Sequence, residues 1–348
     1  MRIALLTYST RPRGGVVHTL ALAEALAALG QDVTVWTLAR GGGFFRPVDP
    51  RVRLSAVPFD EVPGEDVGDR ILRSIRVLRA AFDGSAYDIV HAQDCISANA
   101  AGRCIRTIHH LDTFTTPALA RCHERAIVDP YAHLCVSEAV AAEVRAGWGL
   151  SPTVIPNGVD AARFADATPD RRYGRSVLAV GGIEPRKGSL DLLRAFSHLS
   201  DIPDLRLVFA GGETLFDYRG YRSEFDELGT RLGVDPLILG PVPHDELPGL
   251  VAGAAAFAFP STKEGFGLAA MEALAAGVPV VVRDLPVLRE VFGAAVRYGT
   301  DPASLADALR TAIDKPDPAR AAAGRALAFS HTWADAARRH LDLYASLG

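Results

Sequence analysis

Residues 255–272 read AAFAFPSTKEGFGLAAME and contain three consecutive structural signals. The apolar run Ala255–Phe259 has the length of a buried strand. A short loop with two glycines follows, and the alanine-rich segment that ends at Glu272 has helical character. A buried strand, a glycine loop and a helix in this order predict one repeat of a parallel α/β sheet.

The same alternation extends over the whole chain. In the first half, strands are predicted at Arg2–Tyr8, Val33–Leu38, Asp88–Ala92, Cys104–His109, His133–Val136 and Thr153–Ile155. In the second half, they are predicted at Ser176–Val180, Leu205–Ala210, Leu237–Leu239, Ala255–Phe259 and Val278–Val282. Turn residues at 157–160 and the polar stretch Asp166–Arg175 separate the two series. The expected fold class is therefore α/β, with Rossmann-like domains at residues 1–165 and 166–325 and a C-terminal helix at 326–348.

Composition narrows the function classes. The chain has 348 residues, a formal net charge of −4 and 49% apolar residues, so nucleic acid is not an expected partner. No signal segment and no stretch of about 18 apolar residues occur, which makes a cytoplasmic location the expectation. Four cysteines lack metal-ligand and redox spacings and are interpreted as reduced thiols without a metal: Cys95, Cys104, Cys122 and Cys135.

The loop and helix after Phe259 carry the strongest chemical signal. Free backbone amides near Phe266, Gly267 and Leu268 are placed to bind phosphate or sugar oxygens. Glu264 and Glu272 could accept hydrogen bonds from hydroxyls on different parts of one ligand. The structural alternative is a glutamate favoured by the helix dipole and a second glutamate on the helix surface.

A second signal is the segment GGIEPRKGS at residues 181–189, which follows a predicted buried strand. Arg186 and Lys187 together could neutralise a diphosphate. Lysine is rare in this chain, with only three residues against 34 arginines (37 minus 3), and two of the three lie beside suspected phosphate sites. A solvated turn is the alternative interpretation.

A third set of candidates lies in the first half. Gly14 and Gly15 precede a predicted helix and would let the backbone approach an anion, although a tight turn explains them equally well. His91, His109 and His110 follow predicted strands, and ligands in open α/β sheets bind beyond the carboxyl ends of strands. At least one of these histidines is expected to touch substrate.

The sequence gives weaker signals for an acceptor site and for contact with a membrane. Phe44 and Phe45 could line an acceptor site, but packing at the domain edge is the favoured interpretation. Residues 69–82 form an amphipathic helical pattern with four arginines. A core helix with a solvated arginine face is favoured over association with a membrane surface.

These motifs together resemble the retaining glycosyltransferases of the B fold, in family 4. The resemblance covers nearly the whole chain. It rests on the E-x7-E pair Glu264 and Glu272, the VIPNGVD turn at residues 154–160 with Phe164, and the Arg186–Gly188 segment, whose order and spacing all match.

The resemblance implies two Rossmann-like domains facing each other across a cleft, with a last helix that crosses back to the first domain. It implies a hexosyltransferase that uses a nucleotide-diphosphate sugar without a cofactor or metal. Gly14 and Gly15 would meet the donor diphosphate, and Lys187 would bind it. His109 would lie near the transferred sugar, with His110 as the fallback.

In the same resemblance, Glu264 would contact the donor sugar and Glu272 the ribose. Relatives commonly have Gly-Arg where this chain has Gly181-Gly182, and Arg186 would then replace the missing cation. The implied transfer retains the anomeric configuration, with the leaving phosphate taking the acceptor proton. No Asp-x-Asp triplet occurs to bridge a metal and a diphosphate.

Two other functions stay open at this point. One is a nucleotide-sugar epimerase or phosphorylase on the same fold, which needs no sugar acceptor. The other is a non-catalytic nucleotide-sugar-binding protein. The sequence also leaves open the donor base, the sugar, the acceptor (a sugar, a lipid-linked or a small molecule) and the oligomeric state.

Overall fold

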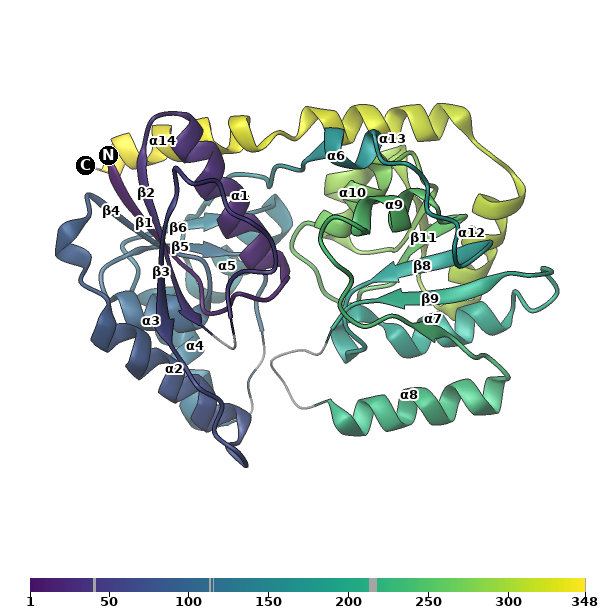
Figure 1. The fold of residues 1–348 in the computed structure, drawn as a ribbon, viewed down its shortest axis with the longest axis horizontal. Coiled ribbons are helices and arrows are strands. Elements are labelled where there is room, and N and C mark those ends of the chain that lie inside the picture. Colours follow the sequence, from purple (N-terminus) through teal and green to yellow (C-terminus); the bar gives the residue numbers. More distant parts are fainter. Residues whose placement is uncertain (40–41, 113, 115, 213–217, 348) are drawn as a thin grey trace. The chain divides into compact units, whose positions relative to one another are not determined.

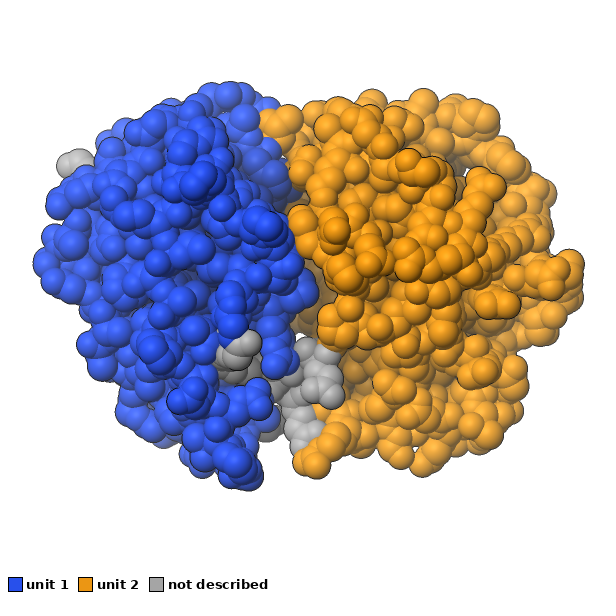
Figure 2. Space-filling view, in the orientation of Figure 1, with its two compact units in different colours: residues 1–158, 333–348 blue, residues 159–332 orange. Residues whose placement is uncertain are grey.

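The computed structural model describes residues 1–39, 42–112, 114, 116–212 and 218–347. The chain divides into two compact units, residues 1–158 with 333–348 and residues 159–332 (Figure 2). Each unit is a parallel sheet with helices on its faces, as Figure 1 shows. This confirms the expected α/β class with two Rossmann-like domains.

Within its described residues, unit 1 has a seven-stranded sheet in the order β3-β2-β1-β4-β5-β6-β7. The strands are β1 (Arg2–Leu6), β2 (Asp32–Ala39), β3 (Arg53–Pro58), β4 (Ile89–Ala92), β5 (Ile105–Ile108), β6 (Ala132–Cys135) and β7 (Thr153–Val154). The helices are α1 (Gly14–Ala28), α2 (Val67–Ala81), the 3-10 turn η1 (Gly84–Ala86), α3 (Cys95–Ala101), α4 (Pro117–Val128), α5 (Glu138–Trp148) and α14 (Trp333–Leu347). Every pairing between these strands is parallel.

Unit 2 has a six-stranded parallel sheet in its described part, in the order β10-β9-β8-β11-β12-β13. Its strands are β8 (Ser176–Val180), β9 (Arg206–Ala210), β10 (Leu237–Ile238), β11 (Ala256–Phe259), β12 (Val280–Arg283) and β13 (Arg297–Gly299). Its helices are α6 (Ala161–Ala165), η2 (Pro185–Lys187), α7 (Ser189–Ser197), α8 (Arg219–Leu232), α9 (Leu247–Ala252), α10 (Leu268–Ala275), α11 (Pro286–Phe292), η3 (Gly293–Ala295), α12 (Pro302–Asp314) and α13 (Pro318–Ser330).

Local sequence signals explain the element boundaries. Helix α5 begins after Ser137, whose side chain accepts a hydrogen bond from the Val140 amide, and ends at Gly149 with a φ of 67°. Strand β3 was not predicted, because it is an edge strand with a largely exposed face and has no continuous apolar run. The other edge strand, β13, was not predicted either, because it has only three residues and no apolar run.

The unit boundaries differ from the domain limits expected at 165/166 and 325/326. Helix α6 belongs to unit 2, because it packs against α10 and α13; its Phe164 is buried. Helix α13 also belongs to unit 2, with Gly324 against the Leu274 side chain of α10. Only α14, from Trp333 onward, returns to the first unit.

The amphipathic segment at residues 69–82 is a core helix of unit 1. Ile71, Ile75 and Leu78 of α2 are buried. Arg73 pairs with Glu65, Nε to Oε1 2.7 Å apart, and its guanidinium lies 4.0 Å from the centroid of the Phe59 ring. Arg76 and Arg79 are exposed, as the interpretation of a core helix with a solvated arginine face predicts, whereas Arg73 is engaged by the unit itself. In the described chain, no helix has both the length and the apolarity needed to cross a bilayer.

A cluster of buried histidines attaches α14 to unit 1. His91 of β4 is completely buried, with Nδ1 2.7 Å from the Tyr344 hydroxyl and Nε2 2.7 Å from the Thr107 hydroxyl. His340 of α14 donates from Nδ1 to the Ala336 carbonyl. Burial lowers the pKa of His340 to about 4 and that of His18 in α1 to about 3. These side chains are therefore neutral at neutral pH.

Acidification should destabilise unit 1 through these histidines. Their folded-state pKa values lie below the unfolded value of 6.5, so their contribution is present above pH 6.5 and is lost as the pH falls toward about 4. Each group should reduce the free energy of unfolding by about 1.4 kcal/mol per pH unit in that window. Chemical denaturation between pH 7.5 and 5 measures this slope.

The variant His340→Asn is the control for this effect. It keeps an amide donor for the Ala336 carbonyl but cannot take up a proton in this range. Its stability should therefore fall less steeply with acid than that of the unmodified protein. Identical slopes in the two proteins would show that His340 does not contribute.

Candidate functional site

In unit 2, two loops at the carboxyl ends of β8 and β11 approach each other closely. Gly188 has a φ of 66°, and a Cβ atom on it would lie 2.2 Å from the Pro260 carbonyl oxygen. The Thr262 amide donates to the Arg186 carbonyl across the same gap, at 2.8 Å. Only glycine permits this approach, which brings η2 beside the loop of Glu264.

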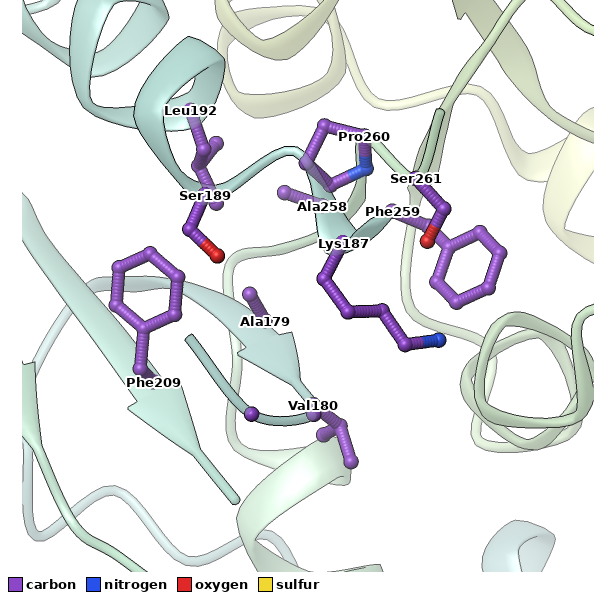
Figure 3. A pocket seen from close by; sticks show the side chains of 12 residues that line it. Ala179, Val180, Lys187, Ser189, Leu192, Phe209, Ala258, Phe259, Pro260 and Ser261 are labelled. Atoms are coloured by element: carbon purple, nitrogen blue, oxygen red, sulfur yellow. The ribbon is translucent and has the colours of Figure 1, made fainter. Parts of the chain in front are cut away.

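A small pocket lies between these loops and the strand ends (Figure 3). Lys187 lines it together with Gly181, whose φ is 141° and whose missing side chain leaves room for the lysine stem. The Lys187 ammonium lies 5.0 Å from the centroid of the Phe259 ring. Ser261, from the β11 loop, also lines the pocket, and its buried hydroxyl has no hydrogen-bond partner among the described residues.

Four charged side chains form the centre of this site. Lys187 Nζ lies 2.5 Å and Arg186 Nη1 3.0 Å from the same atom, Oε1 of Glu264. Arg186 Nη2 also donates to Glu184 Oε1, at 3.1 Å. The structure thus brings together Arg186, Lys187 and Glu264, as the sequence suggested. It adds Glu184, which nothing in the linear sequence pattern marks as an ion-pair partner.

Helix α10 begins directly after this cluster. Its N-cap, Gly267, has a φ of 97°, and a Cβ atom there would lie 3.0 Å from the Phe292 ring. No side chain caps the helix, so the amides from Leu268 onward lack a side-chain acceptor. The Phe266 side chain is buried, 5.7 Å from the ring of His331 by centroids. The expected anion-binding amides therefore lie at the start of a regular helix.

Glu272 lies on α10 in a different environment from Glu264. It is half-buried, and this burial raises its pKa to about 7. Arg163 of α6 partly counteracts the shift, and Asp160, the N-cap residue of α6, adds to it. At neutral pH Glu272 therefore exchanges between its charged and neutral forms, whereas Glu264 is paired with two cations. Arg163 carried no signal in the sequence, and Asp160 appeared there only as part of the turn at residues 154–160.

In unit 1, Gly15 and His109 lie together at the carboxyl end of the sheet. A Cβ atom on Gly15 would lie 3.7 Å from the His109 ring, and the preceding Gly14 is exposed at the start of α1. Burial lowers the pKa of His109 well below its usual value. The His18 ring meets His109 edge-on, with centroids 4.8 Å apart, and its Nδ1 lies 2.9 Å from the Asn157 side-chain oxygen.

The four residues considered for the acceptor side, His91, His110, Phe44 and Phe45, have the following surroundings. His91 is buried with both ring nitrogens hydrogen-bonded, so it supports α14 and does not face a ligand. Phe44 and Phe45 are half-buried and pack against the core cluster of β1, α1 and α14, as domain-edge packing predicts. His110 is half-buried, with Nε2 3.3 Å from Asp112 Oδ1.

The four cysteines contain no disulfide. Cys104 and Cys135 are buried, and Cys95 and Cys122 are half-buried. Burial raises the pKa of Cys95, Cys104 and Cys135 to about 12. These thiols are unreactive at neutral pH.

Both halves of the chain match models of known protein families. Residues 12–163 match the model of glycosyltransferase family 4, and residues 168–327 match that of the glycosyl transferases group 1. The phosphatidyl-myo-inositol mannosyltransferase of Mycolicibacterium smegmatis is 30% identical over 324 residues, 84% of this chain and 78% of that protein. The D-inositol 3-phosphate glycosyltransferase of Xylanimonas cellulosilytica is 29% identical, over 99% of this chain and 96% of its own.

Solved structures share the fold across the whole chain. Sucrose-phosphate synthase of Thermosynechococcus elongatus has a TM-score of 0.81 at 20% identity and covers 99% of this chain, with 98% of its own length matched. HepE of Anabaena, solved with UDP and glucose, has a TM-score of 0.79 at 20% identity, with 99% and 100% covered. With both family models matched in order, the chain belongs to glycosyltransferase family 4 and is a glycosyltransferase of the B fold.

Proposed function

We propose that this enzyme transfers a hexose from a nucleotide-diphosphate sugar to an acceptor hydroxyl, with retention of the anomeric configuration and without a metal. The observation that carries the proposal is the convergence of Lys187 and Arg186 on one carboxylate oxygen of Glu264, beside the uncapped start of α10. Two cations and a helix N-terminus at one edge of a parallel sheet suit a diphosphate. The related HepE was solved with UDP and with UDP-glucose, which supports a nucleotide-sugar donor.

The charge that develops on the leaving diphosphate determines the roles on the donor side. Lys187, Arg186 and the amides from Leu268 onward would stabilise that charge, which is the electrostatic contribution that usually dominates. Arg186 takes the place of the arginine that relatives commonly carry where this chain has Gly182. With two side-chain cations available, the reaction needs no metal to neutralise the diphosphate.

In the proposed route to retention of the anomeric configuration, neither Glu264 nor Glu272 acts as a nucleophile. Oε1 of Glu264 is engaged by two cations, which makes it a poor nucleophile and suits it to positioning the sugar hydroxyls. The leaving phosphate would itself take the acceptor proton, so that the acceptor attacks from the face that the phosphate leaves. Glu272 would accept hydrogen bonds from the ribose hydroxyls. In unit 1, His109 and the amides after Gly14 and Gly15 would complete contacts to the sugar and the diphosphate.

The function is tested by donor binding and turnover. A thermal-shift screen of UDP-, GDP- and ADP-sugars identifies the donor, and release of nucleoside diphosphate is then measured with candidate acceptors. Two relatives are named for inositol-containing acceptors, so the set includes myo-inositol and inositol 3-phosphate. NMR of the anomeric proton in donor and product reports retention. Inversion of the anomeric centre would reject the proposed mechanism.

Lys187→Ala should weaken binding of the preferred nucleoside diphosphate by about 10-fold to 100-fold, since a hydrogen bond to a charged group contributes about 1.5–3 kcal/mol. Isothermal titration calorimetry measures the affinity. Lys315→Ala, at the exposed end of α12, removes the same charge far along the chain and should leave the affinity unchanged. An unchanged affinity in Lys187→Ala would remove this lysine from the diphosphate site.

Donor affinity should rise with pH through about 7, because Glu272 accepts ribose hydrogen bonds more strongly once it is ionised. Affinities measured from pH 6 to 8 give the profile. Glu272→Gln should bind the donor more weakly, and its affinity should no longer show the pH dependence that the Glu272 carboxyl causes. The pH dependence that comes from ionisation of the donor phosphate should remain in both proteins. Superimposable profiles would contradict the ribose role.

A further inference from the structure

The cation pair of the donor site already holds an anion that belongs to the protein. Lys187 Nζ and Arg186 Nη1 both donate to Oε1 of Glu264, and Arg186 Nη2 donates to Glu184. Counted together, these four side chains carry two positive and two negative charges. A diphosphate that approaches the cluster therefore meets a locally neutral group and must compete for the donors.

The competition centres on Lys187. Its side chain is 20% exposed and that of Glu264 is 10% exposed, so the pair is largely shielded from water. Partly buried ion pairs of this kind are screened by salt much less than pairs on the surface. The lysine ammonium has three donors, and the shortest ion-pair contact of the cluster, at 2.5 Å, goes to the Glu264 carboxylate.

A Glu264 carboxylate displaced from Lys187 keeps its contact with Arg186 but loses the shorter of its two charged contacts. Because the site is largely shielded from water, this loss is unfavourable unless another donor replaces the ammonium. Sugar hydroxyls can donate to a carboxylate, whereas a free nucleoside diphosphate offers acceptor oxygens at the corresponding end. An intact donor therefore supplies an anion for Lys187 and hydroxyls for Glu264 in the same binding event.

We propose that Glu264 is a resident anion that the donor diphosphate displaces from Lys187, and that this exchange makes the enzyme prefer intact nucleotide sugars over free nucleoside diphosphates. The inference rests on the proposed function. It also gives a route for product release. Once the sugar has left, Glu264 loses its hydroxyl partners and returns to Lys187, which expels the nucleoside diphosphate.

The test compares affinities for free and sugar-linked nucleotides by calorimetry, using UDP with UDP-glucose, GDP with GDP-mannose and ADP with ADP-glucose. Glu264→Gln, which removes the charge and keeps the shape, should bind the free nucleoside diphosphate about 5-fold to 10-fold more tightly than the unmodified protein. Its affinity for the nucleotide sugar should not exceed that of the unmodified protein. The preference for the intact donor should therefore shrink or reverse.

Two controls separate displacement from a general electrostatic effect. Glu184→Gln removes the other carboxylate, whose ion pair is with Arg186, and should give a smaller gain. In a Lys187→Ala background, Glu264→Gln should give no gain, because the group competed for is absent. Glu264→Ala repeats the comparison if the glutamine variant is unstable in thermal denaturation.

The outcomes distinguish the two proposals. If the unmodified protein binds a nucleotide sugar and Glu264→Gln gains nothing for the free diphosphate, displacement is wrong and the donor assignment stands. Equal gains in Glu264→Gln and Glu184→Gln also overturn displacement. If neither the unmodified protein nor any variant binds any of these nucleotides, the donor class is wrong and displacement falls with it.

Discussion

The donor-side site depends on the close approach of two loops of unit 2, which Gly188 makes possible. Any side chain at this position would collide with the Pro260 carbonyl, and the positive φ disfavours one independently. With the loops this close, the backbone bond from Thr262 to Arg186 forms, and the two cations of η2 reach the carboxylate of Glu264. Backbone geometry thus creates the charge cluster before any ligand arrives.

That cluster assigns unlike roles to two glutamates separated by one helical segment. Glu264 sits in a loop, where Oε1 contacts both Arg186 and Lys187. Glu272 sits on α10, where burial raises its pKa to about 7. One carboxylate is therefore ion-paired and the other is half-buried with a raised pKa, a difference that the spacing E-x7-E does not reveal.

Unit 1 depends on a second buried polar arrangement. His91, Thr107 and Tyr344 form a hydrogen-bonded chain that joins the centre of the sheet to α14. The C-terminal helix is thus held by specific hydrogen bonds as well as by the apolar cluster that contains Ala336 and Ala337. The His18 ring of α1 lies beside the His340 ring of α14 and also beside His109. The His109 ring in turn lies next to Gly15.

The sequence by itself determined the fold class, the two series of strands and the identity of Arg186, Lys187 and Glu264, because apolar periodicity and glycine loops are local properties of the chain. It did not reveal the edge strands β3 and β13, which have no continuous apolar run. Only the tertiary structure decided that Glu184 joins the cations, that His91 supports α14 and that Phe44 and Phe45 pack on the core. Those outcomes depend on contacts between residues far apart in the chain, and burial and ion pairing are set where such residues meet.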